Sequence, residues 1–155
     1  MKKVIVPLVL VALAAVLAAG CGGGGSSKNK AYANSVSQYA SAIDQICGSV
    51  NTKLKAMHTN TLAGLAANGP KAKSIISDGL NKIDNLQPPD QVKSAADDFV
   101  SKGKQAVGMY DSIISAAKNK DTAKIQQIGS KIAALDKSTH QDATTIGALK
   151  CAQNG

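Results

Sequence analysis

The chain has 155 residues, with 18 lysines, 10 aspartates and neither arginine nor glutamate, and its formal net charge is +8 at pH 7. This length suffices for one domain with its own core and is short for two. Only 3% of the residues are aromatic, with one Phe and no Trp. The core must therefore be aliphatic, which favours helices over a β-sandwich. The lack of Arg and of aromatic platforms argues against nucleic-acid binding.

The first 20 residues are organised like a secretory signal peptide. Lys2 and Lys3 precede an apolar run over residues 4–19, and Gly20 and Cys21 follow it. A basic start, a short apolar run and small residues before the cut are the marks of such a signal. Because the run has 16 residues and a comfortable bilayer crossing takes roughly 20, a cleaved signal is favoured over a permanent transmembrane helix.

The end of this signal, Leu17-Ala18-Ala19-Gly20-Cys21, resembles the lipobox of bacterial lipoproteins. In that family a diacylglyceryl group is joined to the cysteine sulfur, the chain is cut before that cysteine, and the new amino terminus is acylated. The resemblance implies lipidation of Cys21 and a location on the extracytoplasmic face of the bacterial cell membrane. Ala18 stands where most members have Leu or Val, and Ala is tolerated there. The alternative is an ordinary signal peptide with a chance cysteine.

Residues 21–30 are expected to form a lipidated tether, and residues 31–155 a helical domain. The tether holds four glycines, two serines, two lysines and Asn29 after Cys21. Such a composition buries nothing and stays flexible, with a mean reach of roughly 15–18 Å for nine residues. After the cut the chain keeps 16 lysines against 10 aspartates, a formal charge of +6. That excess suits a solvated surface or attraction to anionic envelope material.

Apolar residues at helical spacing predict helices over about residues 32–58, 70–86, 90–118 and 122–149. Asn68-Gly69-Pro70 predicts a stop before the second helix, and residues 59–69 stay ambiguous. Asp90 and Asp121 are the expected caps of the third and fourth helices. Gly103 lies on a core stripe, where it permits close packing or leaves a small cavity. Four helices with short connections predict an all-α, antiparallel up-down four-helix bundle.

Assigning Cys21 to lipid leaves Cys47 and Cys151 as a pair in an oxidising compartment, which favours a disulfide. The alternatives are two free thiols or a bridge between molecules. A closed loop of about 100 residues corresponds to about 4–5 kcal/mol of stabilisation in the chain-entropy model.

A bond between these cysteines also sets a register for the first and last helices. His58 and His140 each lie eleven residues from their cysteine, close to three helical turns, so the register places them opposite each other. Residues before about 47 would then form a stalk or pack on the middle helices. Facing imidazoles are candidate metal or haem ligands, although a closed site needs more donors. The alternative is a coincidental alignment of two partly exposed histidines, so neither a metal nor a cofactor is assigned.

Catalysis finds little support, because the carboxylates are scattered and no Gly-x-Ser-x-Gly motif occurs. Ser138, His140 and Asp142 are neighbours, but Ser138 and His140 point to different sides of a helix.

The tether, the helical domain, the Pro-Pro-Asp turn and the late cysteine are similar in general style to small actinobacterial surface lipoproteins, a likeness that carries no site residues. We therefore expect a non-enzymatic envelope-associated binding module. Its partners would be membrane lipid through Cys21, and anionic envelope polymers or another envelope protein. The alternative is a carrier or sensor of a small ligand, metal or haem, using the two histidines or an interhelical cavity.

Overall fold

The computed structural model describes residues 31–32 and 35–153 of the chain. The predicted signal peptide, Cys21 and the tether lie outside these residues. The helices are α1 (Val36–Lys55), α2 (Leu62–Asp84), α3 (Lys93–Gly108), α4 (Tyr110–Lys118), α5 (Thr122–Ile146) and α6 (Leu149–Ala152), with a 3₁₀ turn at Asp90–Val92 before α3. The predicted all-α class is confirmed. None of the described helices is long and apolar enough to cross a membrane.

Three of the helices begin at a polar cap. The side chains of Ser35, Thr61 and Asp121 accept hydrogen bonds from backbone N–H groups in the first turns of α1, α2 and α5. Each bond satisfies a donor that has no partner within the helix. The predicted cap at Asp121 is confirmed. The predicted cap at Asp90 is wrong, because Asp90 starts the 3₁₀ turn and α3 begins without a side-chain cap.

The predicted stop at Asn68-Gly69-Pro70 is also wrong. Helix α2 begins at Leu62 and continues through Pro70 to Asp84. An interior proline costs about 3 kcal/mol relative to alanine, and packing has to offset that cost. Gly69 is buried against α4, where an added Cβ would lie only 2.6 Å from Ile114 Cγ1. This close approach of α2 and α4 outweighs the local signal for a helix end.

The other boundaries differ from expectation in three places. Helix α1 ends at Lys55, before His58. The helix expected over residues 90–118 is divided at Met109 between α3 and α4. The helix expected over residues 122–149 ends at Ile146, because Gly147 adopts a left-handed conformation with φ of 86° that favours glycine at a helix end. The chain then turns into α6, so Cys151 lies on a different helix from His140.

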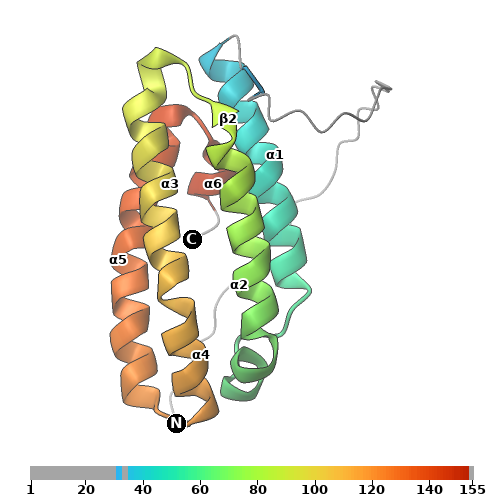
Figure 1. Ribbon diagram of the computed structural model, residues 1–155, viewed down its shortest axis with the longest axis vertical. Helices are drawn as coiled ribbons and strands as arrows, with labels where there is room; N and C mark the ends of the chain where they lie inside the picture. Colours follow the sequence, from blue (N-terminus) through green and yellow to red (C-terminus); the bar gives the residue numbers. More distant parts are fainter. Residues whose placement is uncertain (1–30, 33–34, 154–155) are drawn as a thin grey trace.

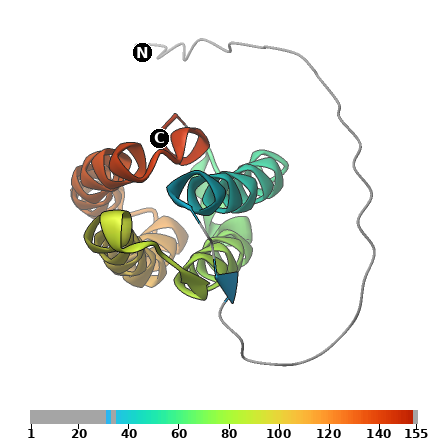
Figure 2. The ribbon, with the colours of Figure 1, turned by 90° about the horizontal axis from the view of Figure 1, so that it is seen from above.

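The long helices lie side by side along the long axis of the molecule (Figure 1). Seen from above, α6 lies between α5 and α1 (Figure 2). A parallel pair of two-residue strands, β1 (Ala31–Tyr32) and β2 (Leu86–Gln87), joins the chain before α1 to the chain after α2. Both strands differ from the prediction, which places residues 32 and 86 in helices.

The core is aliphatic, as the composition predicts, and is built mainly from α1, α2, α3 and α5. Its buried cluster comprises Tyr39, Ala40, Ile43, Leu80, Ile83, Val92, Ala96, Phe99, Val100, Ala143, Ile146 and Ala148. Because the first turns of α1 contribute to this cluster, the residues of α1 before Cys47 pack in the domain and do not form a stalk. Gly103 permits close packing, since the Leu80 side chain would lie 2.6 Å from an added Cβ.

Candidate functional site

The candidate site lies next to α6, in the seam between α1 and α5. Helix α6 has four residues and packs against both α1 and α5, whereas α1 and α5 have little direct contact with each other. A single helical turn cannot fill a seam between helices of 20 and 25 residues. The rest of the seam is therefore left with a gap between the helices.

Two interactions fix α6 to α1. Cys47 and Cys151 form a disulfide with their Cα atoms 5.5 Å apart, within the usual range for such a bond. One turn earlier on α1, the Asp44 carboxylate accepts hydrogen bonds from the backbone N–H groups of Lys150 at 2.7 Å and Cys151 at 3.4 Å. Asp44 thus satisfies donors at the start of α6. It is a residue that the sequence analysis did not single out.

The gap in the seam is a pocket of about 210 Å³. It reaches the core residues Leu80, Ile83 and Phe99. It is lined by Ile46, Cys47, Val50, Asn51 and Leu54 of α1, by Ile76, Gly79, Leu80 and Ile83 of α2, by Phe99 of α3, by Asp136, Thr139 and His140 of α5, and by Cys151 of α6. An apolar cavity of roughly 150 Å³ already takes up benzene, and pockets for drug-sized ligands start at roughly 300 Å³. The pocket therefore suits a small apolar group.

A larger groove of about 500 Å³ runs between α1 and α2. Several polar side chains lie in its walls, among them Gln45, Ser49, Lys53, Asp78 and Lys82. It does not reach Phe99 or the disulfide. The seam pocket is the better candidate, because buried apolar walls with a few polar groups at the mouth are typical of ligand sites.

The polar groups of the pocket come mainly from α5. His140 Nε2 lies 3.7 Å from Asp136 Oδ1, one turn away on the same helix. The Thr139 hydroxyl donates to the Leu135 carbonyl oxygen at 2.7 Å, so its proton is used within α5. Asp136 also affects Tyr110 of α4, which is not part of the pocket lining. Burial, followed by the charge of Asp136, raises the pKa of Tyr110. His140, Asp136 and Asn51 are thus the groups available to orient a ligand.

The structure does not bring the two predicted histidines together around this pocket. His140 lines it, whereas His58 is exposed in the connection after α1 and is not part of the lining. The register prediction is wrong because it treated His140 and Cys151 as members of one helix, and Gly147 ends that helix between them. Among the described residues, no group of three or more His, Cys or Asp side chains has an arrangement that could hold a metal ion.

Asp142 serves a different purpose from its neighbour His140. Its carboxylate accepts a hydrogen bond from Lys102 Nζ at 2.7 Å across the α3–α5 interface. Asp142 is a polar residue next to the buried Ala143, and its partner on α3 accounts for its place at the α3–α5 interface. Asp142 therefore helps to hold α3 and α5 together. Asp136 is the carboxylate that lies beside His140.

Comparison of the chain with protein-family models, curated proteins and solved structures finds no match. The pocket and its chemistry are therefore the guide to function.

Proposed function

We propose that this protein is a lipid-anchored extracytoplasmic binding protein that holds a small, largely apolar ligand in the pocket beside α6. The observation that carries the proposal is the pocket itself, which extends from polar groups at the surface to Leu80, Ile83 and Phe99 in the core. A space of about 210 Å³ is unfavourable if it stays empty, because its walls lose dispersion contacts. A ligand that fills it recovers those contacts and removes apolar surface from water.

The architecture that we propose for the domain is an antiparallel up-down four-helix bundle, in which α3 and α4 together form the third member. The contacts of α2 with α1, α3 and α4, and of α5 with α3 and α4, support this arrangement. So does the course of the chain, which runs down α1, up α2, down α3 and α4 and up α5 (Figure 1). In such a bundle the first and last helices would normally pack together. Here α6 takes part of that place, and the pocket is the remainder.

The anchor that we propose is the lipid on Cys21, on the strength of the lipobox at residues 17–21. The Gly-rich residues that follow would hold the domain near the extracytoplasmic face of the membrane, with membrane lipid as its first partner. Intact mass of the membrane-extracted protein tests this step. We expect the chain from Cys21 onward plus its acyl groups, and a mass that matches the unlipidated chain would rule the anchor out.

Thermal unfolding with a neutral apolar probe tests the pocket. A ligand at 100 times its Kd adds about 2.7 kcal/mol to the stability of the folded state, which raises Tm by several degrees for a domain of this size. We expect such a rise with 1-octanol, and we expect Thr139→Phe to abolish it by placing a ring in the pocket.

Thr144→Phe is the matched control for this experiment. Thr144 is exposed on the same helix and is outside the pocket lining, and its hydroxyl bonds to the His140 carbonyl oxygen at 2.8 Å, as Thr139 bonds to Leu135. The control should keep the rise in Tm. If both variants respond as the wild type does, the probe binds elsewhere and the pocket is not the site.

A further inference from the structure

We propose that the ligand is a single-chain amphiphile with an anionic head, whose chain enters the pocket while its carboxylate or phosphate stays at the mouth beside Lys55 and Lys137. This inference rests on the proposed function, because it names the class of ligand for the same pocket.

Lys55 is placed at the mouth by the geometry of α1. Asn51 lines the pocket, and Lys55 lies one turn further along the same ridge of the helix, since residues four apart are neighbours on a helix surface. Asp44, which contacts the backbone of α6, lies on this ridge as well, eleven residues or about three turns before Lys55. The ridge therefore faces the seam, first toward α6 and then beside the pocket.

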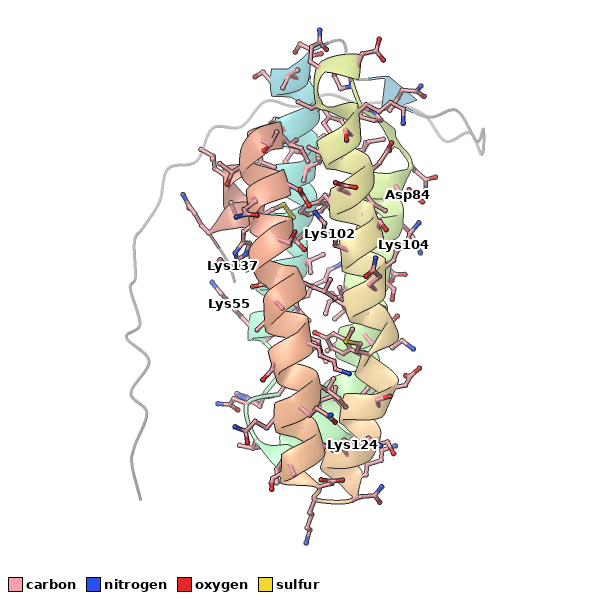
Figure 3. The ribbon with its side chains drawn as sticks, turned by 90° about the vertical axis from the view of Figure 1, so that its left-hand side faces the viewer. Lys55, Asp84, Lys102, Lys104, Lys124 and Lys137 are labelled. Atoms are coloured by element: carbon pink, nitrogen blue, oxygen red, sulfur yellow. A yellow bond between two sulfur atoms is a disulfide. The ribbon has the colours of Figure 1, made fainter. Side chains whose placement is uncertain are left out.

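Lys137 flanks the pocket from the opposite side. It directly follows Asp136 and precedes His140 by three residues, and both of those residues line the pocket. Lys55 and Lys137 project from the same edge of the molecule in Figure 3. The two ammonium groups thus come from the two helices that border the seam.

The charge balance at the mouth favours an anion. Within the described part of the chain, neither Lys55 nor Lys137 forms an ion pair, whereas Lys73, Lys93, Lys102 and Lys104 each pair with an aspartate. Asp136 is the one carboxylate in the pocket lining, and its Oδ1 atom lies 3.7 Å from Nε2 of His140. The ammonium groups of Lys55 and Lys137 therefore outnumber the single carboxylate of Asp136. The long lysine stems can also lie along the chain of an amphiphile while their charges stay in water.

The size of the pocket favours a single chain of moderate length. A volume of about 210 Å³ exceeds that needed for one benzene ring and is smaller than a pocket for a drug-sized ligand. Each methylene that becomes buried should lower Kd about fourfold. Chains of about eight carbons are therefore suitable probes.

Calorimetric titration of the purified full chain with octanoate, octyl phosphate and 1-octanol tests the inference. At low salt we expect at least one of the two anions to bind about 3- to 10-fold more tightly than the alcohol, the gain that two exposed charges provide. Which anion binds distinguishes a carboxylate from a phosphate headgroup. Lys55→Gln/Lys137→Gln should remove the preference for the anion and keep the affinity for 1-octanol within about twofold of the wild-type value. Retained binding of the alcohol also shows that the variant is folded.

Lys124→Gln/Lys131→Gln is the matched control, because it removes the same charge from exposed positions of α5 that lie about 120° or more around the helix from Lys137. It should keep the preference for the anion. Equal binding of the alcohol and both anions by the wild type, or an equal loss in both double variants, would overturn the anionic head while leaving the pocket intact. If none of the three probes binds, the proposed function itself fails.

Discussion

Tyr39 shows how a single polar group is accommodated in the aliphatic core. It is 1% exposed, and burial, together with the charges of Asp97 and Asp84, raises the pKa of its hydroxyl to about 12. The ordinary value is about 10, so the folded protein retains the Tyr39 proton at pH values where the unfolded chain has lost it. The neutral hydroxyl is therefore the form that the fold stabilises.

This pKa predicts a loss of stability in alkali. Since the folded state binds more protons than the unfolded state between pH 10 and about 12, the free energy of unfolding should fall across that window, by up to about 2 kcal/mol. Tyr39→Phe should remove this part of the decline and leave the part caused by lysine titration. Urea unfolding at pH 9 to 12 measures both. Parallel curves for wild type and variant would contradict the assignment.

Lys102 and Asp142 form the most sheltered ion pair among the described residues, with side chains 24% and 14% exposed. Asp142→Asn removes one charge and leaves Lys102 with Asp98, whose carboxylate is 3.8 Å away. We expect a loss of about 1–3 kcal/mol, between the values for exposed and buried pairs. Replacing both partners with leucine should recover most of that loss.

The exposed pair Lys104–Asp84 is the natural comparison (Figure 3). Its N···O distance is 2.8 Å and its side chains are about half exposed. Asp84→Asn should cost at most about 1 kcal/mol. Equal losses in the two variants, measured by urea unfolding, would show that burial does not set the strength of the Lys102–Asp142 pair.

At the scale of elements, α6 depends on contacts far away in the sequence. Asp44→Ala removes the acceptor for the Lys150 and Cys151 N–H groups and should cost about 1 kcal/mol, with faster hydrogen exchange at Ala152 and Gln153. Asp78→Ala is the matched control, since Asp78 is exposed on α2. Equal rates of hydrogen exchange in α6 of the two variants would show that Asp44 does not stabilise this helix.

The adjacent residues Gly69 and Pro70 should respond in opposite directions to alanine. Pro70 is exposed inside α2, so Pro70→Ala restores a helical hydrogen bond and should stabilise the protein by up to about 3 kcal/mol. Gly69→Ala places a Cβ 2.6 Å from Ile114 Cγ1 and should destabilise it, because overpacking typically costs 1–3 kcal/mol. Thermal unfolding of both variants tests the pair. A gain from both would mean that α2 and α4 can separate freely.

The periodic parts of the fold could be predicted from the sequence, and its exceptions could not. Ile43, Phe99 and Ile146 lie on predicted apolar stripes and are buried, because a helical stripe must find a core. The helix through Pro70 escaped prediction because a local stop signal was overridden by packing against α4. The turn at Gly147 escaped because glycine also occurs within these helices, as at Gly48 and Gly129.

The candidate site was predicted only in part, for a related reason. His140 was singled out by residue type and does line the pocket. The helix predicted over residues 70–86 from apolar residues at helical spacing supplies Ile76, Gly79, Leu80 and Ile83. The location of the pocket depends on where α6 lies, which follows from the turn at Gly147 and the contact with Asp44. Of the two alternatives given for Gly103, the structure shows close packing and not a cavity, because the Leu80 side chain packs against it.

At the scale of the molecule, the excess of lysine gives a surface that attracts anions. Beyond the four paired lysines, nine described ones form no ion pair: Lys53, Lys55, Lys71, Lys82, Lys118, Lys120, Lys124, Lys131 and Lys137. We expect the purified Cys21→Ser chain to sediment with phosphatidylglycerol vesicles at low salt and to be released near 0.5 M salt, as screening shortens the range of the attraction to about 4–5 Å. Neutral vesicles are the control. If the protein does not sediment with these vesicles at low salt, anionic envelope material is not its partner.

The bond between Cys47 and Cys151 has a consequence for the continuity of the chain. It closes a covalent ring that spans 104 positions in the sequence and includes α2, α3, α4 and α5. Cleavage of one peptide bond in the ring, such as one in the connection between α1 and α2, opens the ring without releasing a fragment. A single nick by an extracellular protease would therefore leave the whole domain joined to whatever holds its amino terminus.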